Sequence, residues 1–168
     1  YKESGKYRDT NPLDVIHAND AYARGWTGDG VKVGVLDTGI KCDHNDLKNN
    51  LTTTRYTNAY GDGCNDTHGH GTQVAGVIAA EKNDVDMHGV AYDAEIHFAK
   101  IGDGPSVWIQ QYGPNAASQM ADNGVVAVNL SANTKLHNGT VDAMTTIEKD
   151  GSTLYYTNTN WYDTTSIN

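Results

Sequence analysis

Apolar and polar positions alternate along the chain in two distinct patterns. Short runs rich in Val, Ile and Leu predict strands, whereas apolar residues at helical spacing predict helices, and Gly25 and Gly151 mark the ends of two of these helices. The predicted strands span residues 31–37, 94–101, 125–130 and 153–157, and the predicted helices span 13–24, 71–80, 107–123 and 141–149. Continuously apolar strands that alternate with helices are typical of a parallel sheet with helices on both faces, so we predict an α/β fold.

Chemically versatile side chains fall at the ends of these predicted strands. Asp37 ends the first strand, Ser131 follows the third, and the polar segment 157–160 follows the fourth. His70 lies at the start of the helix that comes after the first strand. Because the carboxyl ends of parallel strands meet at one edge, we expect these groups to lie together there. An acid and a histidine so placed are two members of an Asp–His–nucleophile arrangement, which predicts a hydrogen bond between Asp37 and His70.

Length and charge narrow the possible partners. The chain has 168 residues, enough for one domain, and its 12 Lys and Arg against 21 Asp and Glu give a net charge of −9. That charge, with no run of basic residues, disfavours nucleic acid as a partner. No stretch approaches the roughly 20 apolar residues that span a bilayer, so we expect no membrane contact from this segment. Polar residues 1–12 predict an arm ahead of an α/β core at 13–168.

The two cysteines, Cys42 and Cys64, lie in the polar segment 41–69, between the first strand and the next helix. They could be two unrelated buried thiols. We favour a disulfide, because both lie in loop-like sequence near the same predicted edge of the sheet. A disulfide also agrees with a chain located outside the cell or at its surface, since oxidising compartments preserve such bonds.

Two motifs resemble those of the subtilisin-like serine proteases, the subtilases. Asp37 is followed by Thr-Gly, and His70 by Gly-Thr-Gln-Val-Ala-Gly. The resemblance implies a secreted serine endopeptidase that acts on polypeptides, with His70 as the base and Asp37 orienting it. It also implies an incomplete subtilisin-like fold, since residues 1–168 match the N-terminal part of a catalytic domain. The runs 21–28 and 87–94, together with the cysteine pair, are similar to passenger domains of bacterial autotransporter subtilases.

The resemblance also assigns residues around the reacting bond. Ser131, Ala132 and Asn133 fall where the family builds one wall of the substrate groove, which pairs with an extended peptide backbone. Here Asn133 stands where the family has Gly, which puts a side chain beside the peptide. The oxyanion amide falls on Asn160, with Asn158 as a competing assignment.

Metal binding is an alternative role for the histidines near the helix start. His68 and His70 are two residues apart, which is not the spacing of a helical zinc pair, and no Glu follows at the required offset. The resemblance implies that no cofactor is required, but it places a calcium site at Asp46 and Asn83. Oxygen ligands of this kind suit calcium.

The family's third motif, Gly-Thr-Ser followed by small residues, is absent from the sequence. Ser152 lies in Gly-Ser-Thr, but it precedes the fourth strand and Asn160, whereas the family's serine follows that Asn. We therefore expect the serine in a C-terminal remainder of the protein, and we expect the 168 residues alone to be inactive. The alternative is a non-catalytic subtilase-fold module that binds extended peptides.

Overall fold

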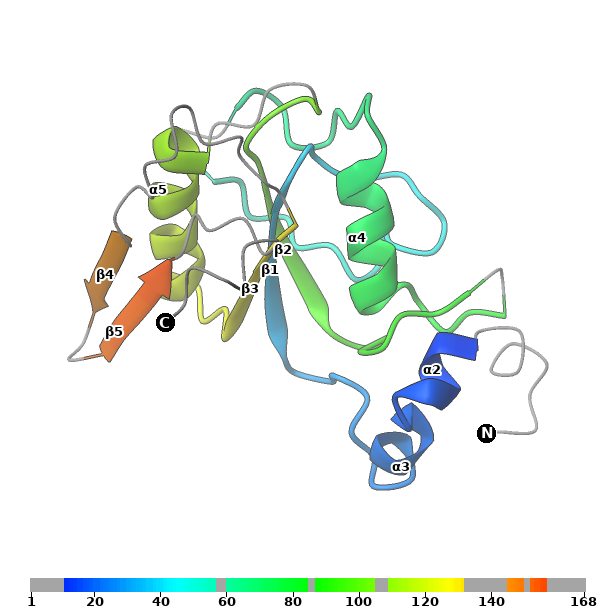
Figure 1. The fold of residues 1–168 in the computed structure, drawn as a ribbon. Coiled ribbons are helices and arrows are strands. Elements are labelled where there is room, and N and C mark those ends of the chain that lie inside the picture. Colours follow the sequence, from blue (N-terminus) through cyan, green and yellow to red (C-terminus); the bar gives the residue numbers. More distant parts are fainter. Residues whose placement is uncertain are drawn as a thin grey trace, which may run out of the picture.

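The centre of the fold is a three-stranded parallel sheet with the strand order β2-β1-β3. The computed structural model describes residues 11–56, 60–84, 87–104, 109–131, 145–149 and 152–156. The sheet consists of β1 (Lys32–Asp37), β2 (Glu95–Lys100) and β3 (Ala127–Leu130), which correspond to the first three predicted strands. Because all three run in the same direction, their carboxyl ends meet at one edge (Figure 1).

Helices cover both faces of this sheet. Successive side chains of a strand point to opposite faces, and β1 shows this clearly. Val35 packs in the core cluster beneath α4 (His70–Ala79), while the next residue, Leu36, packs with Met120 of α5 (Ile109–Asp122). Figure 1 shows α4 and α5 on opposite sides of the strands. The predicted α/β class, with a helix on each face, is confirmed.

The predicted helix at 13–24 is divided into two short helices, α2 (Asn11–Val15) and α3 (Ala18–Tyr22). The break falls at His17, whose φ of 55° is left-handed and cannot continue a right-handed helix. None of the helices in the described part of the chain is long and apolar enough to cross a bilayer.

The helix predicted at 141–149 is wrong. Its described portion is a strand, β4 (Thr145–Lys149), which pairs antiparallel with β5 (Ser152–Tyr156). Two threonines and an isoleucine open β4, and β-branched residues favour extended backbone over helix. The two strands form a separate sheet, so the fourth predicted strand does not extend the parallel sheet as expected.

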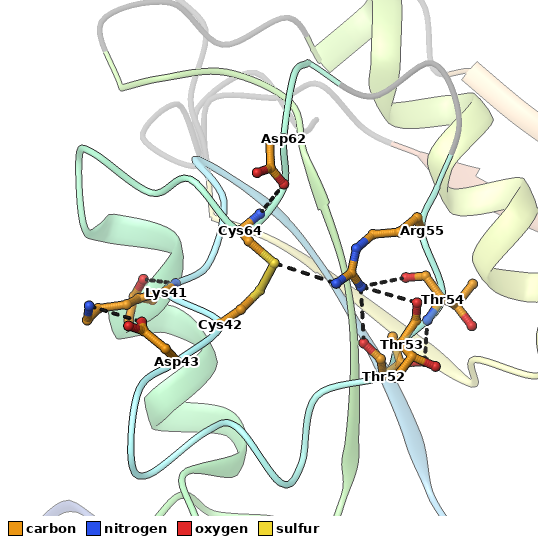
Figure 2. The surroundings of a disulfide bond; sticks show 10 residues. Lys41, Cys42, Asp43, Thr52, Thr53, Thr54, Arg55, Asp62 and Cys64 are labelled. Carbon is orange, nitrogen blue, oxygen red and sulfur yellow. Dashed lines mark hydrogen bonds and ion pairs between the residues drawn. A yellow bond between two sulfur atoms is a disulfide. The ribbon is translucent and has the colours of Figure 1, made fainter.

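A disulfide joins the segment that follows β1 to the segment that precedes α4. Cys42 and Cys64 are bridged, with their Cα atoms 5.1 Å apart, so the predicted bond is present. Beside it, the backbone N–H of Ile40 donates to the carbonyl of Gly63 at 2.8 Å. Arg55 directs a guanidinium nitrogen at the sulfur of Cys64, 3.7 Å away (Figure 2). The bridge therefore holds together the two segments that flank the carboxyl edge of the sheet.

Replacing Cys42 and Cys64 together by Ala tests the contribution of this bridge. The cysteines are 22 residues apart. Opening a loop of that size should lower the free energy of unfolding by about 3 kcal/mol. Denaturant titration of both proteins measures the difference. The wild-type protein unfolded under reducing conditions is the control and should match the double variant. Equal stability of the oxidised wild type and the variant would contradict the prediction.

Candidate active site

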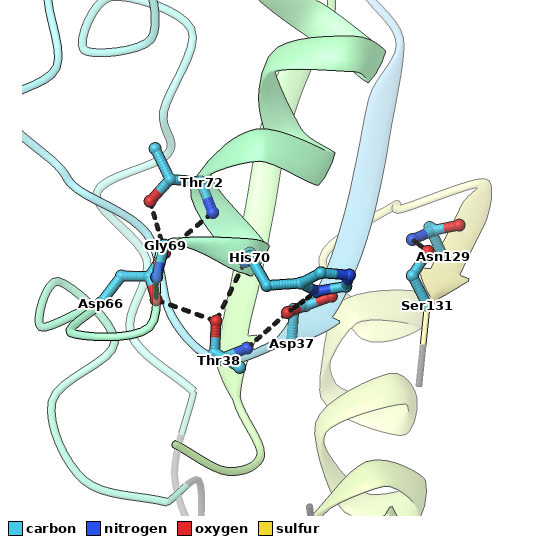
Figure 3. Close-up of polar contacts among 9 residues, drawn as sticks. Asp37, Thr38, Asp66, Gly69, His70, Thr72, Asn129 and Ser131 are labelled. Atoms are coloured by element: carbon cyan, nitrogen blue, oxygen red, sulfur yellow. Dashed lines mark hydrogen bonds and ion pairs between the residues drawn. The ribbon is translucent and has the colours of Figure 1, made fainter. Parts of the chain in front are cut away.

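The carboxyl end of β1 brings Asp37 against the first residue of α4. Oδ1 of Asp37 accepts hydrogen bonds from Nδ1 of His70 and from the backbone N–H of Thr38, both at 2.7 Å. The Asp37 side chain is 3% exposed, whereas that of His70 is 41% exposed. Figure 3 shows the two side chains directed toward each other. Because a carboxylate only accepts hydrogen bonds, Nδ1 carries the proton in the neutral imidazole and Nε2 remains able to accept one. The predicted contact between the two side chains is confirmed.

Glycines make this contact possible. A Cβ atom on Gly71 would lie 2.1 Å from the carbonyl oxygen of Gly39 and 3.1 Å from Cβ of Asp37. The first turn of α4 therefore packs directly on the end of β1, where only glycine fits. Gly69, which precedes the helix, has a φ of 87°, a conformation that glycine adopts at little cost. The glycines on either side of His70 thus set its distance from the carboxylate.

The structure adds Asp66 to the site, a residue that the sequence analysis did not select. Its Oδ1 accepts hydrogen bonds from the hydroxyl of Thr38 and the N–H of Gly69, at 2.8 and 2.9 Å. Its Oδ2 accepts from the N–H and hydroxyl of Thr72, at 2.9 and 2.5 Å. Although burial favours the neutral acid, the hydrogen bonds from Thr72, Gly69 and Thr38 outweigh it and lower the pKa of Asp66. Asp66 lies three residues before Gly69, the N-cap residue of α4, so the N-cap preference for Asp did not single it out.

A buried lysine also borders Asp37. Lys100 is its register partner on β2, is 5% exposed, and donates from Nζ to the carbonyl of Asn65 at 2.5 Å. Oδ2 of Asp37 is buried and has no hydrogen-bond partner among the residues that the structure describes. One oxygen of this carboxylate is therefore engaged and the other is not.

Ser131 follows β3 at the same edge of the sheet. Leu130 pairs with Leu36, so Ser131, directly after β3, is next in register to Asp37, the last residue of β1. The amide of Asn129 donates to the hydroxyl of Ser131 at 2.9 Å (Figure 3). The other residues assigned to substrate or oxyanion binding lie outside the described residues: Ala132, Asn133, Asn158 and Asn160.

The residues expected to bind calcium do lie together. Asp46 is 4% exposed, and its Oδ1 accepts a hydrogen bond from the side-chain amide of Asn83 at 3.1 Å. A carboxylate and an amide are the oxygen ligands that calcium takes, although here the amide presents its nitrogen to the carboxylate. Within the described ranges, no group of three or more His, Cys, Asp or Glu side chains could hold a metal ion.

The central strand of the parallel sheet ends in a carboxylate, and this carboxylate is hydrogen-bonded to the imidazole at the start of a helix. These two groups correspond to the acid and base of hydrolases that use a catalytic triad. Comparison with known families identifies which class of hydrolase this is. A family model described as the subtilase family matches residues 28–164, and this chain belongs to the subtilase family.

Individual relatives agree with that assignment. The extracellular serine protease of Serratia marcescens is 42% identical over 95 residues, which are 54% of this chain and 9% of that protein. The major intracellular serine protease of Bacillus subtilis is 39% identical over 106 residues, 58% of this chain and 33% of that protein. The crystal structure of the serine protease of Aeromonas sobria superposes with a TM-score of 0.57 at 28% identity, covering 67% of this chain and 20% of that one. The chain therefore spans at most a third of these relatives, and the incomplete subtilisin-like fold is confirmed.

Replacing Gly71 by Ala tests how α4 is seated. The added Cβ meets the carbonyl of Gly39, so the helix must move, and we expect a loss of roughly 1–3 kcal/mol in the free energy of unfolding. Gly76→Ala, in the same helix with nothing within 4 Å of its added Cβ, is the control and should be neutral or slightly stabilising. Thermal and denaturant unfolding measure both variants. Equal stability of the two would refute the close packing at Gly71.

Proposed function

We propose that this chain carries the acid and base of a secreted subtilisin-type serine endopeptidase whose serine lies outside the 168 residues. The observation that carries the proposal is the 2.7 Å hydrogen bond from His70 to buried Asp37, in a chain that belongs to the subtilase family. A carboxylate and an imidazole in this relation form a general base that can activate a hydroxyl nucleophile. The substrates are polypeptides, which is the class that serine proteases hydrolyse.

His70 would move the proton in both halves of the reaction. Its Nε2 takes the proton of the serine hydroxyl as the oxygen bonds to the carbonyl carbon of the peptide. It then gives that proton to the departing amine as the peptide C–N bond breaks, and water repeats the sequence on the acyl-enzyme. Asp37 keeps Nδ1 protonated and stabilises the imidazolium that forms in between. The 41% exposure of the His70 side chain supports this role, since a nucleophile from another segment can reach it.

The substrate peptide would bind along the end of β3. Ser131, Ala132 and Asn133 would pair with its backbone by strand addition, and Asn160 would donate its side-chain amide to the oxyanion. The position of β3 supports this, because it is the outer strand on that side of the described parallel sheet.

Location and calcium are further parts of the proposal. The Cys42–Cys64 disulfide supports secretion or display at the cell surface, as does the name of the extracellular relative from Serratia marcescens. The autotransporter passenger domain remains a narrower form of this proposal. Calcium, where bound, would be held by Asp46 and Asn83 and would stabilise the segments on which they lie.

A second candidate is a non-catalytic subtilase-fold module that binds extended peptides. The placement of β3 at the outside of the described sheet favours it, since an outer strand can pair with an extended peptide. Under this alternative, Asp37 and His70 would keep their contact but would have no hydroxyl to act on.

Labelling with a serine-directed fluorophosphonate separates the two candidates. The probe reacts only with an activated serine, so we expect it to label the full-length protein and not the 168-residue chain. His70→Ala should reduce turnover by on the order of 10⁶-fold, the size seen for loss of the base in subtilisin, and Asp37→Asn by somewhat less. Labelling of the short chain that disappears in His70→Ala would place the nucleophile among its own serines. A full-length protein that never labels would leave the binding module as the function.

A further inference from the structure

The side chain of Asp66 connects the two elements that carry Asp37 and His70. On one side it accepts a hydrogen bond from the hydroxyl of Thr38, the residue directly after Asp37. On the other side it accepts the N–H groups of Gly69 and Thr72, which flank His70 at the start of α4. A residue that served only as a helix cap would not need the contact to the end of β1 (Figure 3).

Thr38 completes a closed set of hydrogen bonds between strand and helix. Its hydroxyl donates to Asp66 and at the same time accepts the N–H of Gly71 at 2.9 Å. Its own backbone N–H donates to Asp37, the acceptor of the His70 bond. A shift of Asp66 therefore moves both partners of the Asp37–His70 pair.

We propose that Asp66 is a positioning residue, whose carboxylate holds the end of β1 and the start of α4 so that Asp37 and His70 meet at hydrogen-bonding distance. This inference rests on the proposed protease function. Each oxygen of Asp66 accepts one backbone N–H and one hydroxyl. An amide in its place can accept only one of the two backbone N–H groups, because its other end is itself a donor. The negative charge also suits the N-terminus of a helix.

Asp66→Asn in the full-length protein is the first test. We expect kcat per active site, with sites counted by exhaustive fluorophosphonate labelling, to fall roughly 10-fold to 100-fold, while KM changes little. Asp62→Asn is the matched control: Asp62 lies in the same loop, but its carboxylate accepts only the N–H of Cys64 among the described bonds. Its kcat should stay at the wild-type value.

Variants of Thr38 test the same link without altering Asp66. Thr38→Val removes the hydroxyl that joins the two elements and should reproduce the loss in kcat. If Asp66→Asn does not fold, Thr38→Val serves as the test in its place. Thr38→Ser keeps the hydroxyl and should retain a higher kcat than Thr38→Val. Because both residues act through one contact, the double variant Asp66→Asn with Thr38→Val should lose less than the product of the single losses.

A readout independent of catalysis separates this inference from the proposed function. In ¹⁵N-histidine-labelled full-length protein, the low-field Nδ1–H resonance of His70 reports its bond to Asp37. We expect this resonance to weaken or shift in Asp66→Asn and to persist in Asp62→Asn. A wild-type protein that shows the resonance but no labelling or activity would end the protease proposal and leave Asp66 testable by this signal. An unchanged resonance, with kcat per labelled site at the wild-type value, would overturn the positioning role.

Discussion

The close approach of α4 to the end of β1 sets the geometry of the whole carboxyl edge of the sheet. At Gly71 the helix touches the backbone of the strand end, with no room for a side chain between them. That contact determines where His70 begins the helix, and hence how far its imidazole lies from buried Asp37. The bond between the two side chains depends on this packing, because each is carried by an element that the packing holds still.

Three kinds of force maintain this approach. Packing acts at Gly71, the Asp66 carboxylate joins the two elements by hydrogen bonds, and the Cys42–Cys64 bridge links the adjoining segments covalently. Lys100 adds a fourth support from β2, since it donates to the carbonyl beside Asp66. A hydrogen bond between an exposed imidazole and a buried carboxylate would otherwise compete with water for the histidine. Here the surrounding contacts orient both groups toward each other.

The parts of the fold and site that could be predicted are those that depend on residues close together in the sequence. Strand and helix periods located the parallel sheet and its two covering helices, and the short motifs around Asp37 and His70 indicated their contact. The role of Asp66 was missed because it depends on Thr38, a residue on another element, which periodicity does not bring near. The helix expected at 141–149 is wrong because β-branched residues begin β4 and favour extended backbone. The roles of Asp46, Asn83 and the groove residues stay predictions.

The disulfide also affects the order in which the site can assemble. Without it, Asp37 and His70 are joined only by the long polar loop between them, and bringing them together costs loop-closure entropy. Once Cys42 and Cys64 pair across their separation of 22 residues, the chain path between acid and base runs through the bridge. Both cysteines precede β2 in the chain, so the formation of this bridge requires no residue of β2. The two reactive groups can thus become neighbours through local contacts, ahead of the non-local strand pairing that usually limits the folding of parallel sheets.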